Sequence, residues 1–320
     1  MHATLTPHDI AAVVHVRSAY SGGTATVPEL VEAAADAEAD AVLLTDRDTL
    51  KARDEGYEGW HHGVLVLVGE EVTKAKDRVV VFDKCNPLSF PAHPLPSDLD
   101  ESSVTGVELW SLVADMAEHC RGPRELAAFI SRPDEAIVRP PGRNMADWDR
   151  LCRSRRVVAI GGLGAQEDGQ PAPVGRVLSP LRNARFFRML RTHVLCEEAP
   201  SGEFERDRAL VFGALRAGRC YLGRDSLAGT RGFRYYAEGP DGFLPMGGEA
   251  SAGAWTLRIR LPFAAELRVI RDGEEIERAR GSAFSTEADR PGVYRVEAEL
   301  RTLGRPRTWI VSNPIYLRAA

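Results

Sequence analysis

The chain has 320 residues, of which 44% are hydrophobic and 27% are charged, and its formal net charge is -5. That length accommodates two domains, or one barrel with an appended domain, and the composition suits a large buried core. The negative balance argues against non-specific nucleic-acid binding, which needs a basic face. No segment approaches the roughly 20 consecutive apolar residues of a membrane span, so no membrane partner is expected.

The cysteines and the N-terminus indicate a reducing compartment. The five cysteines are scattered, odd in number and form no C-x-x-C pair, so neither a disulfide framework nor a zinc knuckle is expected. The N-terminus lacks a basic region followed by a long apolar run, so we expect no signal peptide. These features predict a cytoplasmic protein.

The first third of the chain predicts strands alternating with a helix. Four short apolar runs are typical of buried strands, at 10–16, 41–44, 64–68 and 79–82. Between the first two, Thr26 is a helix N-cap with Pro28 in the first turn and Glu29 as its capping-box partner. This helix should extend to about residue 38. A strand–helix–strand unit predicts an α/β fold.

The middle of the chain is less regular. Short strands are predicted at 107–109 and 157–160, and helices at 145–153 and 205–217, the second stopped by Gly218. Residues 167–181 are rich in Pro, Gly and Ala and predict a loop. Residues 183–198 fit a helix and a strand equally well.

From about residue 230 the hydrophobic period changes to two. Apolar and polar side chains alternate along 255–261 and 294–300, and Asp272-Gly273 is a hairpin signal. Several short strands at close spacing predict a small β-sandwich. We therefore expect an α/β barrel domain over residues 1–225 and a β-sandwich domain over residues 226–320.

Polar and charged residues close three of the predicted strands. These strand ends read His15-Val16-Arg17-Ser18, Thr45-Asp46-Arg47 and Gly69-Glu70-Glu71. Catalytic and binding side chains gather at the carboxyl ends of barrel strands. The three strand ends are therefore the predicted functional site.

The order of these and other short motifs resembles the PHP (polymerase and histidinol phosphatase) superfamily, and within it the CehA/McbA-type metallohydrolase branch. The three strand ends resemble that family's H-x-H-S, T-D-H and G-E-E-V-T motifs. Further resemblances follow at Ala92-His93-Pro94, Trp148-Asp149, Gly161–Gln166 and Ser312–Tyr316. The resemblance spans nearly the whole chain. It implies a distorted, TIM-like β/α barrel whose metal cluster supplies a hydroxide that attacks a phosphate ester.

The positions that hold metal in that family are changed in this chain. Arginine stands at three expected histidine positions, Arg17, Arg47 and Arg78, while Gly164 and Gln166 replace an Asp–His pair. A guanidinium has no lone pair for a metal, and glycine has no side-chain donor. The resemblance leaves His15, Glu71 and His93 as residual metal ligands. They would hold at most one weakly bound Zn or Mn ion, and no other cofactor is expected.

We expect the arginines to supply the charge that metal supplies in the family. Buried carboxylates need compensating cations, so the pocket carboxylates are predicted to form ion pairs, Glu71 with Arg17 or Arg78 and Asp46 with Arg47. The unused donors of Arg17, Arg47 and Arg78 would bind a phosphate-like small-molecule anion.

Three functions remain open from the sequence. The first is a degenerate, non-catalytic PHP-type protein that binds an anion at its arginines. The second is an active metal-dependent phosphoesterase with a reduced site at His15, Glu71 and His93. The third is a structural or partner-binding protein whose pocket is filled by its own salt bridges. The sequence does not indicate the oligomeric state.

Overall fold

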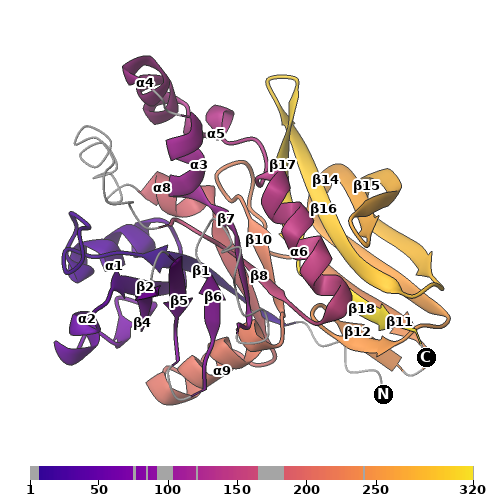
Figure 1. Cartoon of the computed structure of the whole chain (residues 1–320), viewed down its shortest axis with the longest axis horizontal. Helices are drawn as coiled ribbons and strands as arrows, with labels where there is room; N and C mark the ends of the chain where they lie inside the picture. The colour runs from indigo at the N-terminus through magenta and orange to yellow at the C-terminus, as the bar shows by residue number, and fades with distance from the viewer. Residues whose placement is uncertain are drawn as a thin grey trace.

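The computed structural model describes residues 7–74, 77–83, 86–91, 104–119, 122–164, 184–240 and 242–319. Strands dominate the chain, and its described helices all precede residue 217 (Figure 1). None of these helices is long and apolar enough to cross a lipid bilayer.

The elements fall into a mixed first part and an all-β second part. The first part consists of β1 (His8–Val16), α1 (Val27–Asp36), β2 (Ala41–Arg47), α2 (Lys51–Asp54), β3 (Gly59–His61), β4 (Val64–Lys74), β5 (Asp77–Val81), β6 (Ser89–Pro91), β7 (Gly106–Ser111), α3 (Leu112–His119), α4 (Pro123–Ser131), α5 (Pro133–Ala136), α6 (Gly142–Ser154), β8 (Val158–Gly162), α8 (Ala184–Met189), β9 (Arg191–Cys196), α9 (Phe204–Arg216) and β10 (Cys220–Gly223). The second part consists of β11 (Arg234–Gly239), β12 (Gly242–Pro245), β13 (Glu249–Ser251), β14 (Trp255–Arg271), β15 (Glu274–Ala288), β16 (Gly292–Thr302), β17 (Arg305–Ser312) and β18 (Ile315–Arg318).

The predicted strand–helix–strand unit is confirmed. β1 runs parallel to β2, and β2 runs parallel to β4. α1 begins after Thr26, whose backbone N–H donates to the Glu29 carboxylate at 2.9 Å, as the capping box requires. The helix buries Leu30 and Ala34 in a core cluster that also contains Val42 of β2, so its apolar face holds it against the sheet.

The pairing of strands differs from a closed barrel. The main sheet has the order β12-β11-β14-β16-β17-β10-β9-β1-β2-β4-β5-β6, whereas β7 and β8 pair with each other in a separate two-stranded sheet. The predicted TIM-like barrel is therefore not shown by the strand pairing of the described residues. What the structure shows is a sheet-rich chain in which β10 of the first part pairs with β17 of the second.

The structure differs from two local predictions, and tertiary pairing explains one of them. Residues 183–198 contain α8 followed by β9, which explains why their pattern fitted both a helix and a strand. β4 continues to Lys74, so Glu70 and Glu71 lie inside a strand that was expected to end before them. The physical reason is β5, whose antiparallel pairing, with Val80 opposite Glu71, extends β4.

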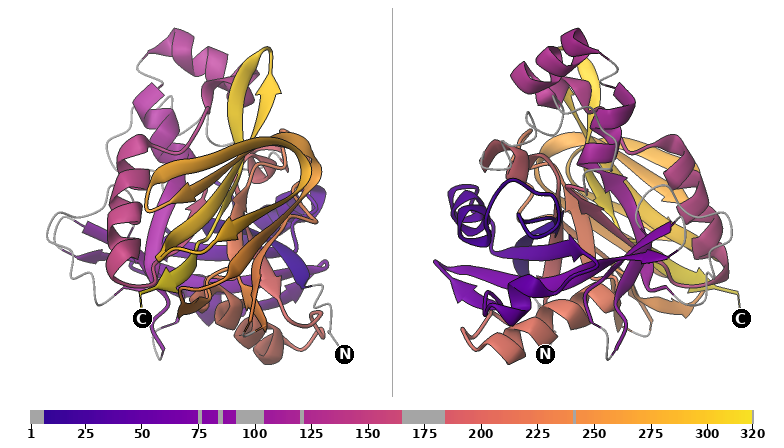
Figure 2. Two further views of the ribbon diagram at one scale, coloured as in Figure 1. Left: turned by 90° about the vertical axis from the view of Figure 1, so that its right-hand side faces the viewer. Right: turned by 60° about the vertical axis from the view of Figure 1, so that its left-hand side comes forward.

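The long strand β14 changes partners half-way along its length. Its residues 256–260 pair with β11 and its residues 266–271 pair with β16, while β15 follows β14 on the other edge. An irregularity in register between Arg260 and Ala265 bends the β14–β15 ribbon. The ribbon curls round so that its halves enclose one apolar core, which includes Leu257, Leu267 and Val296 (Figure 2).

The segment Ser312–Tyr316 ties the end of the chain to the first part. The Asn313 amide oxygen accepts a hydrogen bond from the Ala159 N–H at 2.7 Å, and its nitrogen donates to the carbonyls of Ala159 at 2.9 Å and Cys220 at 2.8 Å. The Tyr316 hydroxyl accepts from the Val157 N–H at 3.0 Å. Asn313 therefore links the two-stranded β7–β8 sheet to β10.

We predict that Asn313→Ala lowers the free energy of unfolding by about 3 kcal/mol, because it leaves buried backbone groups without partners. Urea denaturation followed by circular dichroism would measure this loss. The matched control is Asn86→Ala at an exposed asparagine, which should change stability by less than about 0.5 kcal/mol. Equal effects of the two substitutions would contradict this role of Asn313.

Candidate functional site

Side chains from several strands converge on one face of the main sheet. Leu43 on β2, Leu67 on β4 and Val80 on β5 belong to one core cluster. On the same three strands, Arg47, Glu71 and Arg78 each lie an even number of residues away from that core residue. Side chains along a strand alternate between faces, so all three charged groups share the face of that cluster. Arg47 and Glu71 are also direct cross-strand partners.

A bulge in β1 turns His15 toward the same face. Val14 pairs with Leu43 and Val16 with Leu44, so His15 is an extra residue in the register, and its φ of 58° lies in the left-handed region. Val14 belongs to one core cluster and Val16 to another, which confirms that the bulge reverses the alternation. Functional sites commonly hold such strained backbone.

Glu71 lies at the centre of the group. Its side chain has no exposed surface, and its Oε2 accepts hydrogen bonds from both Nε, at 2.8 Å, and Nη2 of Arg17. The Arg17 side chain is itself 5% exposed. The predicted pairing of Glu71 with Arg17 is thus present as a buried ion pair.

His15 bridges Glu71 to a second carboxylate from β7. Its Nδ1 lies 2.8 Å from Oε1 of Glu108, and its Nε2 lies 3.5 Å from Oε2 of Glu71. Burial lowers the pKa of His15, but the Glu108 and Glu71 carboxylates outweigh burial and raise it to about 9. Burial likewise raises the pKa of Glu71, but His15 and Arg17 bring it to about 2. Both groups are therefore charged at neutral pH.

Arg47 and Arg78 add two more cations near this pair. Arg78 Nε lies 3.8 Å from Oε1 of Glu71, and its side chain is 28% exposed. Burial lowers the pKa of Arg17, Glu71 raises it, and the nearby charges of Arg47 and Arg78 lower it further. The structure thus brings the three predicted arginines together around Glu71.

Asp46 has a different role from the one predicted. It follows Thr45 and precedes Arg47, so alternation directs it to the opposite face from Arg47. There its carboxylate accepts hydrogen bonds from the Ser18 N–H at 2.9 Å, the Ser18 hydroxyl at 2.7 Å and the Ser21 hydroxyl at 2.6 Å. Asp46 therefore holds the loop after β1 in place, and its predicted ion pair with Arg47 was wrong for this geometric reason.

Among the described residues, the predicted metal ligands do not form a complete set. Of the predicted ligands, His15 and Glu71 lie together, while His93 lies outside the described residues. Nδ1 of His15 is already paired with Glu108, and Arg17 binds Oε2 of Glu71, the oxygen that lies 3.5 Å from Nε2 of His15. Across the described ranges, no three His, Cys, Asp or Glu side chains are arranged to hold a metal.

Sequence reasoning assigned no role to a second buried histidine, His193 on β9. Its Nδ1 lies 2.7 Å from Asp9 of β1, and its Nε2 lies 3.3 Å from Asp225 and 2.9 Å from the Thr230 hydroxyl. Arg191 also donates to Asp225 at 2.8 Å. The alternation of β9 could have placed His193 on a buried face, but only the fold brings Asp9 and Asp225 to it.

Comparisons with known proteins give a weak likeness. No protein-family model matches the chain, and no curated protein matches it either. One similar solved structure is that of a two-domain protein from Bacteroides vulgatus that contains a predicted PHP-like metal-dependent phosphoesterase. The identity is 12% and the TM-score is 0.40, over 96% of this chain and 95% of that chain.

We predict that Arg17→Met lowers the free energy of unfolding by about 3–5 kcal/mol, because it strands the Glu71 charge in the interior. Arg78→Met, at a partly exposed arginine, should cost about 1 kcal/mol or less. Urea denaturation of both variants at neutral pH provides the comparison. A loss for Arg17→Met no larger than that for Arg78→Met would show that Glu71 does not depend on Arg17.

The buried His193 predicts a loss of stability at alkaline pH. Burial lowers the pKa of His193, but Asp9 and Asp225 raise it from 6.5 to about 9. A histidine whose pKa is raised by folding contributes stability that is complete below about pH 6.5 and disappears as the pH rises through 9. The contribution is on the order of 3 kcal/mol.

The measurement is the difference in unfolding free energy between the natural protein and His193→Asn, from pH 6 to 9.5. This difference should shrink as the pH rises. His15 titrates in a similar range but is present in both proteins, so its effect cancels. A difference that stays constant across the range would rule out the charged state of His193.

Proposed function

We propose that the chain is a degenerate relative of the PHP-type metal-dependent phosphoesterases, of the CehA/McbA-type branch, and that it binds a phosphate-like anion in place of catalysis through a metal cluster. The observation that carries this proposal is the position of Arg17, Arg47 and Arg78 around Glu71. In this proposal, fixed guanidinium charges have replaced the ions of a multi-metal centre, and no metal or other cofactor takes part.

The balance of charge supports an anion site. Glu108 is paired with His15, while Glu71 is paired with Arg17 and has two further guanidinium groups nearby, those of Arg47 and Arg78. Burial is the main reason that the pKa of Arg17 is lowered, and repulsion from the nearby charges of Arg47 and Arg78 lowers it further. A tetrahedral oxyanion would relieve that repulsion, because its oxygens accept the paired N–H groups of arginine.

The fold proposed with this function is a distorted β/α barrel over residues 1–225 and a β-sandwich over residues 226–320. Two backbone hydrogen bonds support closure of a ring of strands: Thr105 N–H donates to the Ser89 carbonyl at 3.0 Å, and Leu163 N–H donates to the Val14 carbonyl at 3.0 Å. The first joins β6 to the start of β7, and the second joins the end of β8 to β1.

A structural protein is the second candidate, and the burial of Arg17 favours it. Nε and Nη2 of Arg17 both donate to Glu71, as expected for a pocket filled by its own ion pairs. The remaining candidate, a hydrolase reduced to His15, Glu71 and His93, requires His15 to lose its protons. We also propose a cytoplasmic location, which the buried free thiols of Cys152, Cys196 and Cys220 support.

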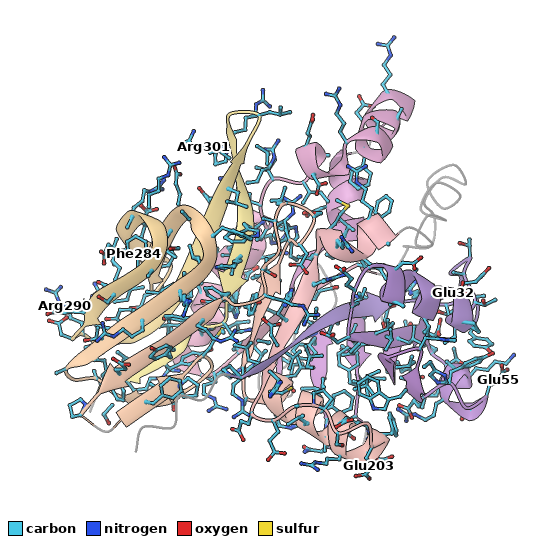
Figure 3. The ribbon with its side chains drawn as sticks, turned by 180° about the vertical axis from the view of Figure 1, so that it is seen from behind. Glu32, Glu55, Glu203, Phe284, Arg290 and Arg301 are labelled. Carbon is cyan, nitrogen blue, oxygen red and sulfur yellow. The ribbon has the colours of Figure 1, made fainter. Side chains whose placement is uncertain are left out.

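The test is calorimetric titration of the full chain with inorganic phosphate at low ionic strength. We expect saturable binding, weakened about tenfold or more in Arg78→Ala through loss of a charge-assisted hydrogen bond. The matched control is Arg301→Ala, at an arginine 59% exposed on the β16–β17 hairpin of the second part (Figure 3). Absence of phosphate binding by the natural protein would leave the structural role in its place.

Metal content and turnover distinguish the hydrolase. Protein purified without added zinc or manganese should contain no stoichiometric metal, and it should not hydrolyse a generic phosphodiester or phosphomonoester with manganese. Tightly bound stoichiometric metal, or turnover abolished by Glu71→Ala, would overturn the proposed loss of catalysis.

A further inference from the structure

The two oxygens of Glu71 are in different situations. Oε2 accepts both N–H groups of Arg17, whereas Oε1 is buried and has no hydrogen-bond partner. Arg78 Nε lies 3.8 Å from Oε1, which is too long for a hydrogen bond. A buried carboxylate oxygen without a donor is costly, so it marks a position where a donor is expected.

Thr45 presents a second buried group without a partner. Its side chain has no exposed surface, and its hydroxyl has no hydrogen bond. Thr45 stands two residues before Arg47 on β2 and pairs with Gly69, two residues before Glu71 on β4. Alternation therefore puts the hydroxyl on the same face as the Glu71 carboxylate. The site thus contains an unsatisfied acceptor and, on the same face of the sheet, a hydroxyl that can donate.

A site made only of arginines would accept any oxyanion of suitable size. The unsatisfied Glu71 oxygen changes this, because a fully ionised anion would place another negative oxygen against it. An anion that keeps a proton can donate a hydrogen bond from its O–H group to Glu71. Its other oxygens can accept hydrogen bonds from the arginines and from Thr45. Hydrogen phosphate has this character near neutral pH, and sulfate does not.

Resting on the proposed function, we propose that the site selects inorganic hydrogen phosphate, with Oε1 of Glu71 accepting the hydrogen bond of the phosphate hydroxyl and Thr45 donating to another of its oxygens. Arsenate, which keeps a proton in the same way, belongs to the same class. Phosphomonoesters lose their second proton near pH 6, so above that pH they are excluded with sulfate.

Arg78 is the side chain through which the anion reaches Glu71. Its Nε lies 3.8 Å from Oε1, and its side chain is 28% exposed, compared with 5% for Arg17. In the proposed complex, Arg78 shifts to contact the anion, and the pair between Arg17 and Glu71 stays intact. The bound anion would then lie between Arg78 and Glu71.

The decisive experiment compares phosphate, arsenate and sulfate by calorimetric titration of the natural protein at neutral pH and fixed ionic strength. We expect phosphate and arsenate to bind with similar affinity, and sulfate about 100-fold more weakly or worse, because it leaves a buried acceptor unpaired. Equal binding of sulfate and phosphate would overturn the selectivity and leave the anion site intact. Binding of none of the three would instead overturn the proposed function.

A variant separates the part played by Thr45. Thr45→Val should weaken phosphate binding by about tenfold and leave the preference over sulfate in place, and Thr45→Ser should restore affinity. Circular dichroism would confirm that both variants are folded. Unchanged phosphate affinity in folded Thr45→Val would show that this hydroxyl does not reach the anion.

Discussion

A carboxylate held out of water requires a cation, and this requirement organises the strand ends of the protein. Glu71 has no exposed surface, and it keeps its charge because Arg17 donates two N–H groups to one of its oxygens. The bulge at His15 serves the same end, since it turns the imidazole toward Glu71 and Glu108. The left-handed backbone of His15 thus places a cation beside two buried carboxylates.

Arginine satisfies this requirement differently from a metal ion. A metal can be exchanged and can activate water, whereas a guanidinium is covalently fixed, always protonated and able only to donate hydrogen bonds. A site rebuilt around Arg17, Arg47 and Arg78 would lose the chemistry of hydroxide attack and keep an affinity for anions. That contrast is the physical content of the function proposed for this chain.

The same solution recurs elsewhere in the interior. His193 lies between Asp9 and Asp225, and Arg191 completes that cluster. At the contact between the two parts, Arg295 of β16 pairs with Asp149 of α6 and, at 2.9 Å, with Glu297. Asp149 comes from the Trp148-Asp149 motif, so this motif acts here as a tie between α6 and the second part of the chain.

Local patterns in the sequence determined what depends on neighbouring residues. The capping box at Thr26 and the alternation along β14 both follow from contacts within a few positions, and both are present. The sequence also indicated that Glu71 needs an arginine, because a carboxylate and three cations stand at strand ends. The sequence did not indicate whether Arg17 or Arg78 pairs with Glu71. It also predicted an ion pair between Asp46 and Arg47, whose side chains point to opposite faces of β2.

Tertiary structure decided the rest, because pairing partners lie far apart along the chain. The pairing of β4 with β5 extends β4. Glu108 contacts His15 although 93 residues separate them, and Asn313 forms hydrogen bonds with β8 and β10. The sequence thus indicated that the carboxylates at the strand ends would be buried, since side-chain type and period are local properties. Which groups compensate them was decided by strand register, which no local pattern encodes.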